Sequence, residues 1–225
     1  MEKGLIIIGD SAFAEIAYEY FTHDSEYTVK AFSVENNFRK KDFLFGLPII
    51  PLEELFNLFP PDKNDAFVAL TYGNLNRNRT RLYFLLQEMG YNLATYISSR
   101  CFIWSNASIG KNCFIFENNV IQPFVKIGNN TILWSGNHIG HHSCIEDNVF
   151  VSSHVVISGF VYVSSNCFLG VNSTIINNIT IAEDTWVGSN VTITRDTQPG
   201  DFYKPYSCER AKITTHQYFK LKDLI

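Results

Sequence analysis

The sequence predicts two structural parts, a small α/β domain over residues 1–98 and a parallel β-helix over residues 99–198, followed by a C-terminal tail over residues 199–225. Two observations predict this organisation. Strand-like and helix-like segments alternate in the first hundred residues, and a six-residue repeat of aliphatic residues fills the second hundred. The chain has 225 residues, of which 46% are hydrophobic, so it is long enough to bury a core in each part.

The N-terminal part has no six-residue period and reads as strands alternating with helices. The expected strands are residues 4–9, 27–34, 65–71 and 92–97, and the expected helices are residues 13–21, 51–55 and 75–89. Such alternation is typical of a small parallel sheet with helices outside it, which here amounts to about half of a Rossmann fold.

Two turns of this domain are candidate ligand sites. Gly9, Ser11 and Ala12 occupy the first strand-to-helix turn, where backbone N–H groups at a helix N-terminus can hold a phosphate. Only the first glycine of the dinucleotide fingerprint is present, so a plain tight turn is the alternative interpretation. Gly73 and Asn74 follow the third strand at the same edge of the sheet, which is where open α/β sheets bind ligands.

The second hundred residues contain a strict repeat. From Ile103 to Ile193, sixteen positions spaced by six all carry Ile, Leu or Val, without an insertion. The residue two positions earlier is mostly small, and Cys101, Cys113 and Cys167 fall there, so we expect core thiols rather than disulfides. The residue three positions later is mostly Asn or Asp, which tolerate the left-handed backbone conformation of a corner. One unit is therefore a strand and a corner, three units close a coil, and about five coils stack.

Composition excludes several classes of protein. The 18 basic and 22 acidic residues give a net charge of -4, whereas a nucleic-acid groove needs a basic face. No apolar run approaches the length of a membrane span, and the run near the N-terminus is too short for a signal peptide. We therefore expect a cytoplasmic protein with neither a nucleic-acid nor a membrane partner.

A half-Rossmann domain followed by about five six-residue-repeat coils resembles the hexapeptide-repeat sugar acetyltransferases of bacterial glycan synthesis, including that of the lipopolysaccharide O-antigen. It is most similar to the nucleotide-linked 4-amino-sugar N-acetyltransferases and the sialic-acid O-acetyltransferase group. The resemblance implies a left-handed β-helix, which runs against the usual right-handed crossover. It also implies a homotrimer with active sites between adjacent β-helices, acetyl-CoA as cosubstrate, and a nucleotide-sugar against the N-terminal domain.

The resemblance also implies a catalytic histidine. Four of the six histidines fall within seventeen residues, and His141 matches the family's general base, which takes a proton from the sugar amine. His142 follows where relatives often carry a carboxylate, so the group that orients His141 is left open between His142, Glu146 and Asp147. His138 is assigned to the substrate cleft, but for both His138 and His154 two interpretations stay open, a place in the lining of that cleft or a packing role.

Ligand-binding residues are carried over from the same resemblance. Gly159 lies eighteen residues after His141, one coil further on, so it offers a bare N–H to the thioester carbonyl or serves only as a corner glycine. The resemblance places further acetyl-CoA contacts at Gly170, Val171, Gly188 and Ser189.

For the nucleotide-sugar, the resemblance implies contacts from both strand-to-helix turns of the N-terminal domain. It adds Glu35, after the second strand, and Arg77, at the start of a helix. A solvated loop acid and a surface arginine are the alternative interpretations of these two residues.

The sequence leaves three functions to be compared. N-acetylation of a nucleotide-linked amino-sugar, most simply a 4-amino-4,6-dideoxyhexose, is the first, and O-acetylation of a sugar such as sialic acid is the second. A non-enzymatic β-helix scaffold is less favoured, because the exposed columns are mixed rather than a regular threonine array. The histidine spacing does not suit the zinc site of a β-helix carbonic anhydrase, so we expect no metal.

Overall fold

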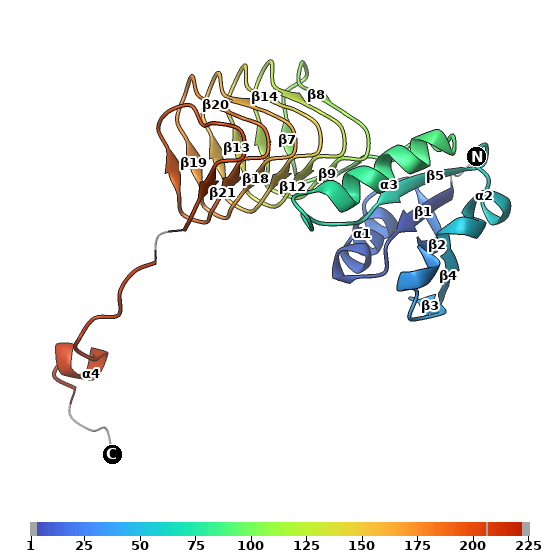
Figure 1. Cartoon of the computed structure of the whole chain (residues 1–225), viewed down its shortest axis with the longest axis horizontal. Helices are drawn as coiled ribbons and strands as arrows, with labels where there is room; N and C mark the ends of the chain where they lie inside the picture. The colour runs from blue at the N-terminus through green and yellow to red at the C-terminus, as the bar shows by residue number, and fades with distance from the viewer. Residues whose placement is uncertain (1–3, 206, 222–225) are drawn as a thin grey trace.

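The computed structural model describes residues 4–205 and 207–221. Residues 1–3, which belong to the expected α/β domain, and residues 206 and 222–225, which belong to the expected tail, lie outside the described residues. Figure 1 shows the α/β domain next to the first coils of a stack, near β9 and β12, with the C-terminal segment extending away from the last coil.

The α/β domain is built on a five-stranded sheet with the strand order β3-β4-β2-β1-β5. Its strands are β1 (Gly4–Ile8), β2 (Thr28–Val34), β3 (Phe43–Leu44), β4 (Leu47–Pro51) and β5 (Asn64–Val68). Its helices are α1 (Ala12–His23), α2 (Leu55–Leu58) and α3 (Arg77–Glu88), with short 3-10 turns at Asn36–Phe38 and Leu52–Glu54. β1, β2, β4 and β5 run parallel to one another, as the alternation of strands and helices predicts.

Two elements differ from the prediction. Residues 43–51 form the hairpin of β3 and β4, and the sequence did not indicate β4 because Pro48 and Pro51 interrupt it. The expected strand over residues 92–97 contributes only one bridge to the sheet, between Ala66 and Leu93. Its last residues, Tyr96–Ile97, instead form β6, which pairs with the β-helix.

The second part is a three-sided parallel β-helix whose sides we call faces 1, 2 and 3. Face 1 consists of β7 (Phe102–Ile103), β10 (Val120–Ile121), β13 (His138–Ile139), β16 (Val156–Ile157), β19 (Thr174–Ile175) and β22 (Thr192–Ile193). Face 2 consists of β8 (Ser108–Ile109), β11 (Lys126–Ile127), β14 (Cys144–Ile145), β17 (Tyr162–Val163) and β20 (Thr180–Ile181). Face 3 consists of β6 (Tyr96–Ile97), β9 (Phe114–Ile115), β12 (Ile132–Leu133), β15 (Phe150–Val151), β18 (Phe168–Leu169), β21 (Trp186–Val187) and β23 (Phe202–Tyr203).

The repeat aliphatics form the core of the β-helix. From Ile115 to Ile193 they are fully or almost fully buried, together with the residues two positions earlier except the partly buried Val191. At the corners, the residue three positions after the aliphatic adopts a positive φ, as at Asn112 (53°) and Asn148 (64°). Asn is favoured there because it tolerates the left-handed conformation, so the columns read from the sequence are confirmed.

The α/β domain covers face 3. The outward side chains of this face are mostly aromatic, and α1 packs on the first of them, with Phe13 contacting Phe114 edge to face at 5.4 Å. Phe150 and Phe168 are also buried, whereas Phe202 at the far end is 60% exposed. Faces 1 and 2 are not covered in this way, and this asymmetry positions the candidate sites.

The β-helix extends past the expected limits of residues 99 and 198 at both ends, because β6 and β23 add strands to face 3. After β23 the chain leaves the coils and forms a single capped turn, α4 (Thr215–Tyr218).

Candidate active site

His141 lies on the outside of the β-helix, at the corner between face 1 and face 2, which we call the 1/2 corner. It follows β13 and precedes β14, and its side chain is exposed. Its backbone N–H donates to Gln122 Oε1 at 2.9 Å, which ties this corner to the preceding coil. In the described part of the chain, the ring nitrogen Nε2 has no hydrogen-bond partner, so it is available to a ligand.

His142 orients the neighbouring ring. Its Nδ1 lies 3.2 Å from Nδ1 of His141, so one of the two nitrogens donates and the other accepts. The His142 ring is stacked between Phe124 and Phe160, with ring centroids 4.5 and 4.8 Å away. This sandwich fixes the ring, and the positive φ of 60° at His142 turns the chain at the corner. Neither Glu146 nor Asp147 hydrogen-bonds to His141.

Gly159 makes room for the His141 ring. A Cβ atom at this glycine would lie 2.8 Å from Cε1 and 2.9 Å from Nε2 of His141, closer than real Cβ contacts allow. Its φ is not in the positive range, so glycine is needed here for space rather than for backbone conformation. The ring therefore rests on the next coil, and this packing sets the direction of Nε2.

The other residues expected near acetyl-CoA lie elsewhere on the β-helix. Gly170 and Gly188, with Val171 and Ser189, follow face-3 strands at the corner that leads into face 1. A Cβ at Gly170 would meet the backbone of the next coil at 2.7 Å, so the stacking of coils alone requires glycine there. His138 lies on β13 of face 1, three residues before His141, and is half-buried.

A second candidate site lies in the α/β domain, at the C-terminal ends of β1, β2 and β5. Here a cavity of about 280 Å³ includes Gly9 and Ser11 in its lining. Gly9 has a φ of 130°, and a Cβ there would lie 3.0 Å from the carbonyl oxygen of Ala69, so this backbone needs glycine. Ser11 is the N-cap of α1, and Ala12 is its first residue; the N–H groups of this first turn lack intrahelical acceptors.

Polar side chains converge on the same cavity. Ser33, at the end of β2, is fully buried, and its Oγ has no hydrogen-bond partner among the described residues. Glu35 is held by Arg81 in a two-point ion pair, at 2.9 and 2.6 Å. Phe38 lies at the exposed rim. Ser33 was not among the residues expected from the sequence, although a hydroxyl within the apolar second half of this strand was a usable signal.

Four expected nucleotide-side residues do not line this cavity. Ala12 follows the lining residue Ser11 but is not itself part of the lining. Gly73 and Asn74 are exposed in the loop before α3, where Gly73 neighbours the cavity residue Asn78. Arg77 points to the β-helix instead, because both carboxylate oxygens of Asp184 bind its Nη2, at 2.6 and 2.7 Å. The arginine that reaches the cavity is Arg81, one helical turn further on.

The described residues contain no group of three or more His, Cys, Asp or Glu side chains arranged to hold a metal ion. Within the same part of the chain, no helix is long and apolar enough to span a membrane.

Comparison with known proteins agrees with the repeat. Residues 106–141 and 124–159 match the family described as bacterial transferase hexapeptide (six repeats). Among curated proteins, no sequence matches this chain.

Several solved structures share the whole fold. A histidine-to-asparagine variant of perosamine N-acetyltransferase from Caulobacter crescentus, in complex with CoA and GDP-perosamine, has a TM-score of 0.81 and 22% identity, over 90% of this chain and 93% of that one. WeeI from Acinetobacter baumannii AYE has a TM-score of 0.71 and 18% identity, over 88% and 94%. The acetyltransferase domain of PglB from Neisseria gonorrhoeae FA1090 has a TM-score of 0.56 and 18% identity, over 91% and 97%. The fold is therefore an N-terminal α/β domain followed by a left-handed β-helix.

Proposed function

We propose that this chain, a hexapeptide-repeat protein, is an acetyl-CoA-dependent N-acetyltransferase that acts on the amino group of a nucleotide-linked amino-sugar. The observation that carries the proposal is the exposed His141 ring, seated on Gly159 with Nε2 free, in a molecule that also has a nucleotide-sized cavity. The structurally similar perosamine N-acetyltransferase binds CoA and GDP-perosamine, which supports the same pair of ligands here.

The cavity of the α/β domain suits a nucleoside diphosphate. The free N–H groups and the positive dipole end at the start of α1 favour a diphosphate beside Ser11. The buried hydroxyl of Ser33 lacks a partner, and an unpaired buried polar group is unfavourable unless a ligand or water satisfies it. Glu35 presents a carboxylate to ligand hydroxyl or amino groups.

His141 is suited to be the general base. In the proposed step, the sugar amine attacks the thioester carbonyl carbon, an N–C bond forms, and the C–S bond breaks to release CoA. His141 Nε2 accepts the proton that the amine loses, and the leaving sulfur is the acceptor that returns the ring to its starting state. If His141 Nδ1 donates to His142 Nδ1, Nε2 is left unprotonated, which is the form that a base requires. His142 thus takes the orienting role.

The two sites lie on different sides of the β-helix, which argues for a reaction between copies. The α/β domain covers face 3, and His141 lies at the 1/2 corner, which is the corner opposite face 3 in a three-sided coil. We therefore propose that the nucleotide-sugar held by one copy is acetylated at the His141 of a neighbouring copy, in a homotrimer.

Exposed apolar residues support this assembly. Phe102 and Val156 on face 1, and Trp104, Phe124 and Phe160 beyond it, are exposed together on one side of the β-helix. Large apolar side chains exposed on the side that the α/β domain leaves uncovered support an interface there. The other edge of face 1 carries the four residues expected to contact acetyl-CoA, Gly170, Val171, Gly188 and Ser189. Acetyl-CoA would reach them from His141 only if it lies along this interface.

Binding of a nucleoside diphosphate tests the α/β site directly. We expect GDP, UDP or dTDP at about a hundred times its Kd to stabilise the protein by about 2.7 kcal/mol, several degrees in Tm. Ser11→Asp should abolish this shift, because its carboxylate repels a diphosphate, while Asp remains a favourable residue at the N-cap position of α1. Ser207→Asp, with the same charge change in the tail, is the matched control and should keep the shift. No shift with any of the three nucleotides would contradict the assignment.

Gly159→Ala tests the seat of the His141 ring. The new methyl group must push the ring aside, and because the ring is the end of an exposed side chain, folding should be little affected. Turnover should fall by roughly 10²-fold, the usual consequence of misplacing a reacting group by about 1 Å. The comparison is Ser158→Ala in the same corner, and equal activity of the two variants would contradict the role of the packing.

Acceptor choice separates N-acetylation from O-acetylation. The cavity favours an acceptor linked to a nucleoside diphosphate, which a free sialic acid does not carry. Assays with acetyl-CoA and each acceptor class decide between them, and turnover with a hydroxyl acceptor alone would refute N-acetylation.

A further inference from the structure

The start of α3 is attached to one column of β-helix corners. Asn112, Asn130, Asn148, Asn166 and Asp184 are spaced by eighteen residues, so they stack at the corner between face 2 and face 3. The Asn112 amide donates to Asn130 Oδ1, and the Asn130 amide donates to Asn148 Oδ1, both at 2.8 Å. The ladder continues into the α/β domain, because the N–H of Val68 in β5 donates to Asn112 Oδ1 at 2.8 Å.

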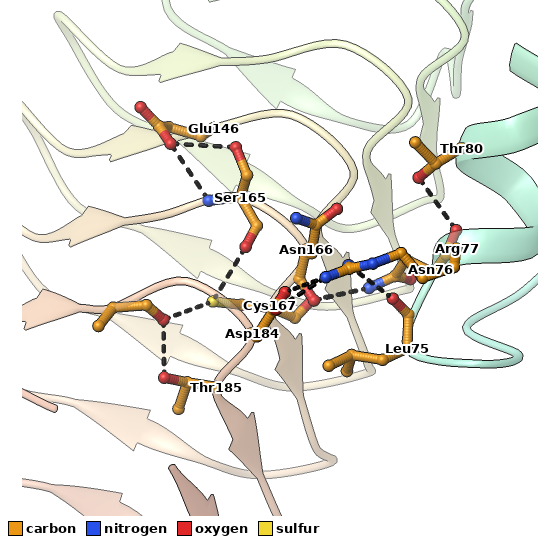
Figure 2. Close-up of polar contacts among 11 residues, drawn as sticks. Leu75, Asn76, Arg77, Thr80, Glu146, Ser165, Asn166, Cys167, Asp184 and Thr185 are labelled. Carbon is orange, nitrogen blue, oxygen red and sulfur yellow. Dashed lines mark hydrogen bonds and ion pairs between the residues drawn. The ribbon is translucent and has the colours of Figure 1, made fainter. Parts of the chain in front are cut away.

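Two side chains from the start of α3 bind the later rungs of this column. Figure 2 shows Asn76 and Arg77 reaching from the helix toward Asn166 and Asp184. The Asn76 amide donates to the carbonyl oxygens of Asn166 and Cys167, at 3.1 and 3.2 Å. Arg77 binds both oxygens of Asp184, and this ion pair is partly exposed.

Arg79 binds the middle rungs and is fully buried. Its guanidinium donates to the backbone carbonyl oxygens of Asn130, Asn148 and Val149, and to that of Thr71 in the α/β domain. None of the carboxylates in the described ranges hydrogen-bonds or pairs with it. Burial lowers the pKa of Arg79 to about 9, still above neutral pH, so the group stays charged and depends on these carbonyls. Because these acceptors belong to both parts of the molecule, Arg79 fixes α3 against the β-helix.

The same stretch of α3 forms a wall of the nucleotide cavity. Asn78, Arg81 and Leu82 line the cavity, while Asn76, Arg77 and Arg79 hold the β-helix; we call the latter three residues the α3 hook. The turn into the helix is conformationally unfavourable, because Asn74, Leu75 and Asn76 all have positive φ, at 51°, 44° and 65°. Such a turn persists only where surrounding contacts hold it, and the hook supplies those contacts.

We propose that the α3 hook is a positioning device, which sets the place of the nucleotide cavity relative to the β-helix and thereby the point at which the sugar amine meets the acetyl group. The inference rests on the proposed transferase function. The hook residues touch neither ligand; they act through the wall residues of α3. Loosening the hook should therefore misplace a bound nucleotide-sugar without preventing nucleotide or acetyl-CoA binding.

The exposed pair offers a test without a buried change. Arg77→Asp places two carboxylates together and should reduce kcat roughly 10-fold or more, while the KM for acetyl-CoA and the thermal shift caused by the nucleoside diphosphate stay as in the wild type. Adding Asp184→Arg restores opposite charges and should recover most of kcat. Glu19→Gln, which removes the exposed Glu19–His23 pair on α1, is the control and should keep full turnover. Unchanged kcat in Arg77→Asp, or no recovery in the double variant, would overturn the proposal.

Hydrogen exchange gives a readout that does not depend on activity. In Arg77→Asp and in Arg79→Lys, the amides of Val68 and Thr80 should exchange faster, while that of Ile139 in the β-helix core is unchanged. Equal exchange at Val68 and Thr80 in wild type and both variants would refute the hook. If the wild-type protein acetylates no nucleotide-linked amino-sugar, the proposed function is refuted. The exchange rates alone then test whether the hook anchors α3 to the β-helix.

Discussion

Replacing His141 with alanine is expected to reduce acetyl transfer by roughly 10²- to 10⁴-fold, the usual contribution of a positioned general base. The physical reason is the loss of Nε2, the ring nitrogen that Gly159 and His142 hold in place at the 1/2 corner. Because the side chain is exposed, the Tm should change little. Steady-state kinetics with acetyl-CoA and an amino-sugar nucleotide would measure the effect.

His154→Ala is the matched control for this experiment. The His154 ring also rests on a glycine one coil away, since a Cβ at Gly136 would lie 2.6 Å from its Nδ1, but it belongs to a different corner. The control should keep near wild-type turnover. Equal losses in the two variants, or none in His141→Ala, would remove His141 from the role of base.

Mixing two inactive variants should restore activity if the reaction takes place between copies. His141→Ala lacks the base but keeps the nucleotide cavity, and Ser11→Asp lacks the diphosphate site but keeps the base. In randomly mixed trimers with cyclic symmetry, about a quarter of the interfaces combine an intact cavity with an intact His141 from the neighbour. We therefore expect about a quarter of the wild-type turnover from an equal mixture of unfolded chains that are refolded together.

The control is a mixture of His141→Ala with the double variant that carries both changes, which has no intact base and should stay inactive. If the first mixture also stays inactive although mixed oligomers form, the nucleotide-sugar bound in one copy reacts at the His141 of the same copy. Mass spectrometry of the intact complexes would establish that mixed oligomers are present.

The β-helix was predictable because its period is local. Each unit of six residues carries its own inward aliphatic, from Ile103 to Ile193, and its own corner residue, so the pattern is legible without any long-range contact. The α/β domain was predicted less completely. β4 contains two prolines, and residues 92–97 divide between one bridge in the sheet and β6 of the β-helix. How residues 92–97 pair depends on which strand lies beside them in the folded protein, and composition does not determine this.

The candidate sites show the same division. Eighteen-residue stacking placed Gly159 beside His141 from the sequence alone. The structure adds that the His141 ring occupies the space that the glycine leaves, and the expected contact of the Gly159 N–H with the thioester stays a prediction. Among the arginines of α3, helical periodicity does not say which points to the cavity. Asp184 lies more than a hundred residues away in the chain, and its carboxylate draws Arg77 away from the cavity and leaves Arg81 there.

By itself the sequence determined the repeat, the columns of strands and corners, and the histidine cluster, because each depends on residues close together in the chain. Tertiary structure decided how the α/β domain sits on face 3, which side chains line its cavity, and which group orients His141. These depend on contacts between segments that only folding brings together, such as the hydrogen bonds of the buried Arg79 to carbonyl oxygens of two consecutive coils and of a loop. Those contacts place the domain opposite the 1/2 corner, because the aromatic face 3 packs against it and the adjoining column of corner asparagines hydrogen-bonds to it.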